Sequence, residues 1–120
     1  MTDPFALTDE TLQAILQDQV EDAIANQLVW HYLGYRQVDG QWDTTLVVSH
    51  WREEYPTPPD FIDSRPATVK LTRSIPKEDK QLLKEELKFG GYKVDELVPR
   101  KTRRATMVNW LLSYRKQHPA

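Results

Sequence analysis

PRKTRRATMVNWLLSYRK, residues 99–116, has the pattern of a long helix that its neighbours bury on most sides. A wide arc of its helical wheel is apolar and consists of Met107, Val108, Trp110, Leu111, Leu112 and Tyr114. The polar strip that is left is narrow and consists of Thr102, Thr106, Asn109 and Ser113. A helix with so wide an apolar arc packs against several partners. We therefore expect residues 100–116 to form a helix whose apolar side chains, aromatic ones included, belong to the core.

Four basic residues crowd the start of this helix: Arg100, Lys101, Arg103 and Arg104. We call these four residues the basic rim. Cations at a helix start oppose the helix dipole, at a cost of about 0.3–1 kcal/mol each when they are exposed. The arrangement becomes favourable when an anion lies there, because backbone N–H groups and guanidinium forks then converge on it. The sequence therefore predicts an exposed anion-binding or partner-binding site at the basic rim.

The charges of the chain are distributed unevenly, although the net charge is only −2. The acidic residues before position 36, where no Lys or Arg occurs, are Asp3, Asp9, Glu10, Asp18, Glu21 and Asp22. Residues 97–120 hold the basic rim, Arg115 and Lys116, and no Asp or Glu. Such asymmetry has two interpretations. The basic end binds an external partner, or the two ends of the chain lie against each other.

Length and composition restrict the class of protein. At 120 residues the chain forms one globular domain, residues 1–120, that can bury about two-thirds of the surface of the unfolded chain. The absence of cysteine excludes disulfide bonds, thiolate catalysis and cysteine-ligated metal sites. The start, MTDPFALTDETL, lacks the features of a secretory signal, and no apolar run approaches the roughly 20 residues that cross a membrane. We expect a soluble, cytoplasmic protein with no membrane contact.

Two helices are predicted in the first third of the chain. Apolar residues recur at helical spacing over residues 9–17 and again over residues 19–33. Asp18 followed by Glu21 resembles a new helix start, and Gly34 is a typical helix end.

A β-hairpin is predicted around the dipeptide Asp39-Gly40, the strongest short-range hairpin signal in the chain. Its strands are residues 35–38 and 41–44, and a two-residue turn places Arg36 opposite Asp43 as a favourable charge pair. A short helix around residues 44–54 follows, with Leu46, Val47 and Trp51 as its buried residues.

Residues 55–66, YPTPPDFIDSRP, are predicted to be irregular but ordered, because proline removes backbone donors while Phe61 and Ile62 anchor the segment. Residues 67–73 fit a strand or a helix capped by Ser64, and we favour the helix. Another helix is predicted from Pro76 to about Lys88, ended by Gly90-Gly91. The fold class is thus mainly α with one short β-hairpin in a compact single domain, or α+β if residues 67–73 form a strand.

The sequence contains no complete set of residues that is typical of a catalytic site. His50 shares a helical face with Glu53 or Glu54, but a metal site of this kind requires a third protein ligand, so we expect neither metal nor cofactor. His31 is better explained as a half-buried core residue. Asp60, Asp63 and Arg65 could line a cleft together with His31 or His50, although they equally fit helix capping and local pairing.

Four segments resemble a known family: NQLVWHYLGYR, WREEYPTPPDFI, SRPATVKLTRSIP and PRKTRRATMVNWLL. The sequence is similar along nearly its whole length to an uncharacterised family, a domain of unknown function, of cyanobacteria and plant chloroplasts. That resemblance implies a cyanobacterial cytoplasmic location. It implies no catalytic residue.

The function expected from these observations is non-enzymatic binding, as an adaptor, of an acidic protein partner through Arg100, Lys101, Arg103 and Arg104. Nucleic-acid phosphates, RNA or DNA, are the alternative ligand of the same rim. A helix-turn-helix is excluded, because the connection from Lys88 to Arg100 is too long and the helix after it is too apolar. A small enzyme that uses the Asp60, Asp63 and Arg65 loop is the third candidate. The oligomeric state is left open.

Overall fold

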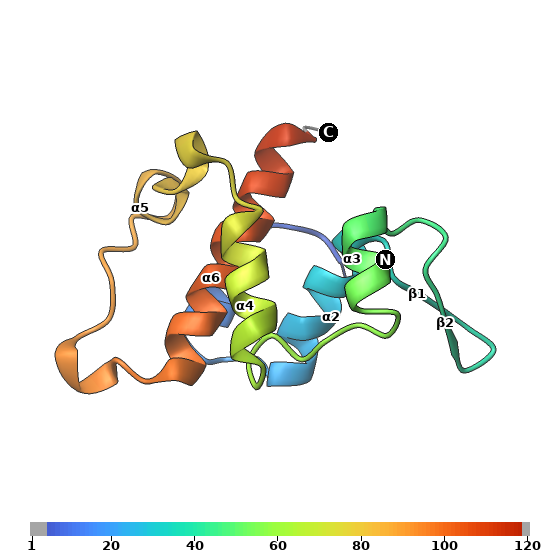
Figure 1. Ribbon diagram of the computed structural model, residues 1–120. Coiled ribbons are helices and arrows are strands. Elements are labelled where there is room, and N and C mark those ends of the chain that lie inside the picture. Colours follow the sequence, from blue (N-terminus) through green and yellow to red (C-terminus); the bar gives the residue numbers. More distant parts are fainter. Residues whose placement is uncertain (1–4, 119–120) are drawn as a thin grey trace.

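One long helix, α6 (Pro99–Gln117), lies in the middle of the molecule (Figure 1). The structure is a computed structural model and describes residues 5–118. The other helices are α1 (Asp9–Leu16), α2 (Asp22–Leu33), α3 (Ser49–Glu54), α4 (Arg65–Arg73) and α5 (Leu82–Leu87). Two 3-10 turns are η1 (Lys77–Asp79) and η2 (Val94–Glu96), and the two strands are β1 (Arg36–Val38) and β2 (Gln41–Asp43). The predicted class, mainly helical with one hairpin in a compact single domain, is confirmed.

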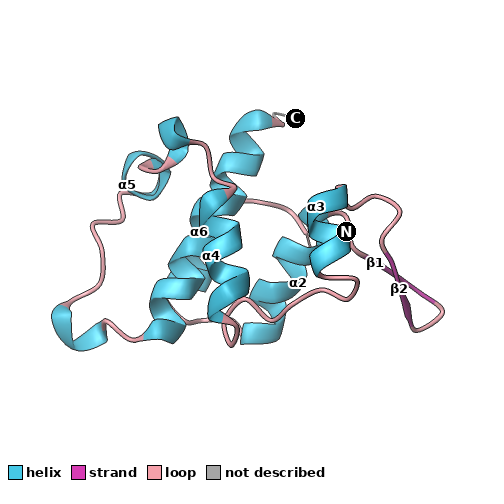
Figure 2. Ribbon diagram, viewed as in Figure 1, coloured by secondary structure: helices cyan, strands magenta, loops and turns pink. Residues whose placement is uncertain are grey.

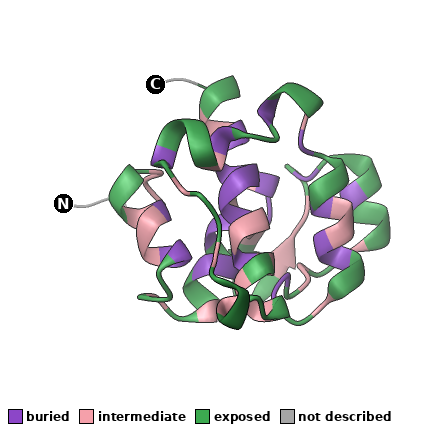
Figure 3. Ribbon diagram, turned by 90° about the vertical axis from the view of Figure 1, so that its left-hand side faces the viewer, coloured by how far each residue is buried: buried purple, intermediate pink, exposed green. Residues whose placement is uncertain are grey.

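The hydrophobic core is built around α6, because α1, α2, α4 and α5 all pack against it. Met107, Val108 and Leu111 of α6 are completely buried, as are Leu12 of α1 and Leu71 of α4. Figure 3 shows buried residues gathered on the inner helix and exposed ones on the outer turns. The prediction that the apolar arc of residues 100–116 belongs to the core is confirmed. Within residues 5–118, none of the helices has both the length and the apolar character needed to cross a bilayer.

The C-terminal half of the polar strip of α6 is more deeply buried than the sequence suggested, whereas Thr102 in its first half is exposed. Asn109 and Ser113 are 6% and 3% exposed, because η1 covers them. Ser113 donates a hydrogen bond to the carboxylate of Asp79 at 2.7 Å, and Asn109 donates to the Asp79 carbonyl at 3.2 Å. Polar side chains on α6 therefore hold the η1 segment in place.

Gly34 ends the second helix as predicted, but the predicted start at residue 19 with an Asp18–Glu21 cap is wrong. α2 begins at Asp22, and its N-cap residue Glu21 makes no side-chain capping bond. Thr8 caps α1 through its hydroxyl, and Asp18 adopts a left-handed conformation (φ 59°) at the turn into α2. Gly34 ends α2 with φ 110°, and its N–H group bonds to the carbonyls of Trp30 and His31. A Cβ atom on Gly34 would lie 2.5 Å from the Leu46 carbonyl oxygen, so α2 ends in direct contact with the next loop.

The hairpin forms in the predicted register and extends away from the helices (Figure 2). Arg36 lies opposite Asp43, as predicted. The charge pair itself is absent from the described part of the chain. Arg36 instead donates to the carbonyls of His31 and Tyr35, and Asp43 accepts from the Thr45 backbone and hydroxyl. The end of α2 and the turn after β2 each use one partner of the predicted pair.

The short helix after the hairpin was predicted too long. Residues 44–48 form a turn, and α3 begins at Ser49. Val47 and Trp51 are buried as expected, but Leu46 is 64% exposed. The Leu46 prediction was wrong because its backbone, rather than its side chain, packs against Gly34.

The loop before α4 is irregular, with Phe61 and Ile62 buried, as predicted. Residues 67–73 are helical, which decides between the two patterns in the sequence. Ser64 caps α4 by accepting a hydrogen bond from the Ala67 N–H group at 3.3 Å.

The predicted helix from Pro76 to Lys88 is wrong in its length. It is divided into η1 and the shorter α5. Gly90-Gly91 was predicted to end it, but Lys88 does so with a left-handed conformation (φ 56°). The division allows Asp79 to reach Ser113 and Lys116 on α6, while Leu82 and Leu87 still enter the core.

Candidate functional site

The basic rim was predicted to be exposed, and Arg104 contradicts that prediction most clearly. Its side chain is 1% exposed. Its guanidinium group donates to the Ile15 carbonyl at 3.1 Å, the Val20 carbonyl at 2.9 Å and the Asp22 carboxylate at 2.7 Å. Arg104 thus fastens the turn between α1 and α2 to α6.

Arg100 lies four residues before Arg104 on α6. It binds the connection between α1 and α2 from the solvent side. Its Nη1 and Nη2 atoms donate to both carboxylate oxygens of Asp18, at 2.8 Å and 2.7 Å. Asp22 lies 2.9 Å from Nη2. The hydrogen bonds that Arg100 donates to Asp18 lower the pKa of Asp18, and those that it donates to Asp18 and Asp22 raise the pKa of Arg100. This part of the rim already holds its anions, and they come from the chain itself.

The other two members of the rim are also engaged. Arg103 donates to the Ile62 carbonyl at 2.8 Å, and Lys101 lies 3.4 Å from the Glu96 carboxylate. At the far end of α6, Arg115 pairs with Asp9 at 2.8 Å. The interpretation in which the acidic and basic ends of the chain lie against each other is therefore confirmed for Arg100, Arg104 and Arg115. That a partner binds at the rim stays a prediction.

A second positively charged surface lies between α3 and α4. We call it the α3–α4 groove, and its volume is about 670 Å³. It is lined by His50 and Glu54 from α3, by Arg65, Pro66, Val69, Lys70 and Arg73 from α4, and by Ser74. The positions 65, 69 and 73 repeat every four residues and therefore share one face of the helix.

Lys70 links the two walls of the groove. Its ammonium group donates to the His50 carbonyl at 3.0 Å, lies 3.2 Å from the Glu54 carboxylate and lies 5.0 Å from the centre of the Trp51 ring. Arg65 and Arg73, in contrast, are exposed and form no ion pair with any residue between 5 and 118. The groove therefore has a fixed floor and two available guanidinium groups.

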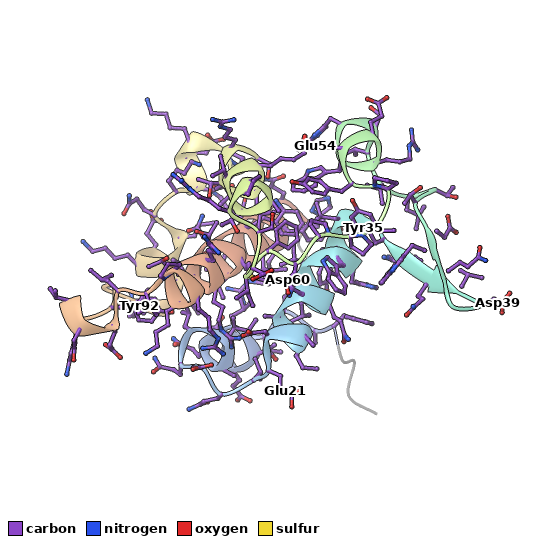
Figure 4. All side chains as sticks on the ribbon, turned by 60° about the horizontal axis from the view of Figure 1, so that its bottom comes forward. Glu21, Tyr35, Asp39, Glu54, Asp60 and Tyr92 are labelled. Carbon is purple, nitrogen blue, oxygen red and sulfur yellow. The ribbon has the colours of Figure 1, made fainter. Side chains whose placement is uncertain are left out.

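The residues proposed for a small enzyme do not come together. Arg65 and His50 both line the α3–α4 groove, but Asp60 and Asp63 do not. Asp60 accepts hydrogen bonds from Asn26 and from the Ile62 and Asp63 N–H groups, so its carboxylate supports the loop. Figure 4 shows Asp60 well apart from Glu54 on α3.

His31, the other histidine considered for catalysis, lies outside the groove, stacked on the ring of Phe5. Among residues 5–118 no three His, Asp or Glu side chains gather as metal ligands.

Sequence reasoning missed Val69, Lys70 and Arg73 as groove residues. The signal was present, because Arg65, Val69 and Arg73 have the spacing of one helical face once residues 65–73 are taken as a helix. The packing of α3 against α4 was not predicted, since the long proline-rich loop separates the two helices in sequence.

Comparison with known proteins supports the fold and assigns no activity. A solved structure, determined by solution NMR, is 64% identical to this chain, with a TM-score of 0.81. The match covers 92% of this chain and 93% of the other. No match is found among curated proteins. The family described as Domain of unknown function (DUF1823) matches residues 6–116, and the chain therefore belongs to that family.

Proposed function

We propose that this protein is a non-enzymatic binding protein that holds an acidic segment of a partner protein in the α3–α4 groove. The observation that carries the proposal is the contrast between two sets of arginines. Arg100, Arg103 and Arg104 of the basic rim bind acceptors within the chain, whereas Arg65 and Arg73 stand exposed beside a groove without ion pairs in residues 5–118.

The chemistry of the groove suits carboxylates. A guanidinium group can donate two parallel hydrogen bonds to a carboxylate, and such charge-assisted bonds are the stronger kind. Pro66 and Val69 supply apolar surface between the two arginines. A partner segment with carboxylates at both ends and an apolar side chain between them would match this arrangement.

The spacing of the arginines sets the spacing of the carboxylates. Arg65 and Arg73 are eight residues apart on α4, about 12 Å along the helix axis. An extended peptide advances about 3.3 Å per residue, so acidic residues about four positions apart would face both arginines. This spacing makes the proposal testable with defined peptides.

The basic rim is the other surface for the same class of partner. A partner there would compete with Asp18 and Asp22 for Arg100, which is bonded to both. The groove requires no such exchange, and for that reason we place the partner in the groove.

The experiment measures binding of fluorescein-labelled peptides by fluorescence anisotropy. One peptide carries two glutamates four residues apart with a leucine between them, and a second has the same composition with the glutamates adjacent. We expect tighter binding of the first peptide. The double variant Arg65→Gln/Arg73→Gln should weaken it at least about tenfold, the loss expected for about 1.4 kcal/mol.

A matched control removes two positive charges elsewhere. Lys77→Gln/Lys84→Gln changes two exposed lysines on η1 and α5 and should alter the affinity less than twofold. Equal losses in both double variants would mean that only net charge matters, and would refute a site in the groove. If a single-stranded oligonucleotide binds instead, with an affinity that falls steeply as salt rises, nucleic acid replaces the acidic protein as ligand.

The source and location of the protein belong to the same proposal. The sequence resemblance supports a cyanobacterial or chloroplast origin and a cytoplasmic place of action. Fractionation of a cyanobacterium that encodes a close relative should recover that relative in the soluble fraction, and recovery with membranes would refute the location.

A further inference from the structure

A second hollow, of about 450 Å³, lies between α2 and the β-hairpin. We call it the aromatic cleft. The residues that matter for its chemistry are Gln27, Trp30, Tyr35, Arg36, Gln37 and Trp42. It shares no lining residue with the α3–α4 groove.

The hairpin register builds the outer wall of the cleft. Gln37 lies opposite Trp42 in the β1–β2 pair, so both side chains are on the same face of the hairpin. That face is turned towards α2, because the Trp42 ring meets the Trp30 ring edge-on at 5.6 Å and 79°. The two indoles form a corner with perpendicular walls.

The inner side of the same aromatic surface already holds a proline-rich segment, the chain's own. The Trp30 indole N–H group donates to the Pro59 carbonyl at 2.6 Å. The Tyr35 hydroxyl donates to the Tyr55 carbonyl at 2.7 Å. Both acceptors belong to YPTPP, residues 55–59. These hydrogen bonds, from aromatic N–H and O–H groups to backbone carbonyls, have the chemistry with which aromatic-lined grooves hold proline-rich segments.

The outer side offers the same chemistry without an occupant from residues 5–118. The Trp42 indole N–H group and the carboxamides of Gln27 and Gln37 have no hydrogen-bond partner there. A proline-rich segment presents carbonyl acceptors and few N–H donors, so it suits a wall of donors. Its polyproline II conformation is preformed, which lowers the entropy lost on binding.

The shape of the cleft suits a proline ring. Because the Trp30 and Trp42 rings are nearly perpendicular, a puckered pyrrolidine ring can contact both faces of the corner with its C–H groups.

We propose that the aromatic cleft binds a proline-rich segment of a partner protein, with the Trp42 indole N–H group donating to a carbonyl of that segment. Together with the α3–α4 groove, the cleft gives the protein two independent peptide-binding surfaces, as an adaptor requires.

The test follows the indole N–H resonances of the four tryptophans in the 15N-labelled protein. The probe is an uncharged, end-blocked decapeptide of proline with one central tyrosine, and a glycine–serine decapeptide with the same tyrosine is the control ligand. We expect the Trp42 resonance to shift with the proline peptide only. The resonances of the buried Trp51 and Trp110 should stay in place and report that the fold is intact.

Variants locate the site. Trp42→Ala should abolish binding of the proline peptide. Trp42→Phe keeps a ring but removes the N–H donor, and it should weaken binding several-fold. Gln37→Ala should weaken binding as well. Val38→Ala is the matched control, because Val38 is exposed on the opposite face of the hairpin. If Trp42→Ala unfolds the protein, Trp42→Phe and Gln37→Ala carry the test.

Three results would overturn the proposal: no shift at millimolar proline peptide, equal shifts with the glycine–serine peptide, or undiminished binding by both Trp42→Phe and Gln37→Ala. The Arg65→Gln/Arg73→Gln variant should bind the proline peptide with unchanged affinity. The proposal for the aromatic cleft is therefore tested independently of the proposal for the α3–α4 groove.

Discussion

Arg104 has a structural role that cannot be predicted from its residue type: it links α6 to the connection between α1 and α2. In sequence it is one of four cations near a helix start. In the fold it is buried and bonded to two carbonyls and a carboxylate from the turn between α1 and α2. Nothing in the local pattern separates it from Arg103, because the separation arises from which side of α6 faces that turn.

Arg104→Ala should lower the free energy of unfolding by about 3–5 kcal/mol, since it opens a cavity in the core and leaves the Ile15 and Val20 carbonyls without their donor. Asp22 keeps Arg100 as its partner. Urea denaturation measures the change. Arg115→Ala is the matched control: its pair with Asp9 lies at the surface, where such pairs contribute about 1 kcal/mol or less. A loss for Arg104→Ala as small as that for Arg115→Ala would disprove the structural role.

At the scale of the elements, helix ends determine how the segments fit together. Gly34 ends α2 with positive φ and also lets the Leu46 backbone approach. Gly40 has positive φ too (79°), but nothing lies within 4 Å of the place where its Cβ would be. An alanine at Gly40 would therefore cost only the free energy of an unfavourable backbone conformation. An alanine at Gly34 would add the free energy of a steric clash with Leu46.

Gly40→Ala should destabilise the protein by about 1 kcal/mol, the usual cost of positive φ for a residue with a side chain. Gly34→Ala should cost clearly more, about 3 kcal/mol, because the clash with backbone adds to that strain. Thermal and urea unfolding of the two variants give the comparison. Similar losses at both positions would show that α2 and the loop near Leu46 can separate freely.

Local signals in the sequence predicted most of these elements. Asp39-Gly40 gave the hairpin and its register, Gly34 the end of α2, and Ser64 with Pro66 the start of α4. These succeeded because each depends on the residues that form it.

The failures depend on contacts between distant segments. Asp79 turns onto α6 to meet Ser113 and divides the helix predicted from Pro76, and Lys88 adopts the left-handed conformation two residues before the first available glycine. For the candidate site, Arg65 and His50 were named together as candidate cleft residues, and both line the groove. Val69, Lys70 and Arg73 were not named, because their part in the groove depends on how α4 packs against α3.

For the whole molecule, the opposite charges at the two ends of the sequence are largely a packing device. Asp9, Asp18 and Asp22 meet Arg115, Arg100 and Arg104 across the interface of α6 with α1 and α2. This accounts for the charge asymmetry without an external partner at the rim.

Stability should therefore fall in acid. Hydrogen bonds from Arg100 lower the pKa of Asp18, and those from Lys116 and Ser113 lower the pKa of Asp79. A carboxyl whose folded pKa lies below its unfolded value of about 3.9 stabilises the fold above that value, and the contribution is lost as pH falls through the folded pKa. The free energy of unfolding should be nearly flat from about pH 7 to 5 and decline below about pH 4.

Asp79→Asn should make this decline shallower, while Asp95→Asn on the exposed η2 turn should leave its slope unchanged. Urea denaturation at a series of pH values measures the slope. A decline as steep in Asp79→Asn as in the unchanged protein would show that Asp79 is not among the carboxylates responsible.

The central position of α6 has a consequence for the newly synthesised chain. The helices α1, α2 and α4 are translated first, yet the surface that covers their apolar sides is supplied by residues 99–117. At a synthesis rate of about 5–20 residues per second, roughly 5–20 seconds pass between the synthesis of α1 and that of α6. During this interval the ribosome-bound chain exposes Leu12, Ile15 and Leu71, so the nascent protein should be a ligand for chaperones until α6 has emerged.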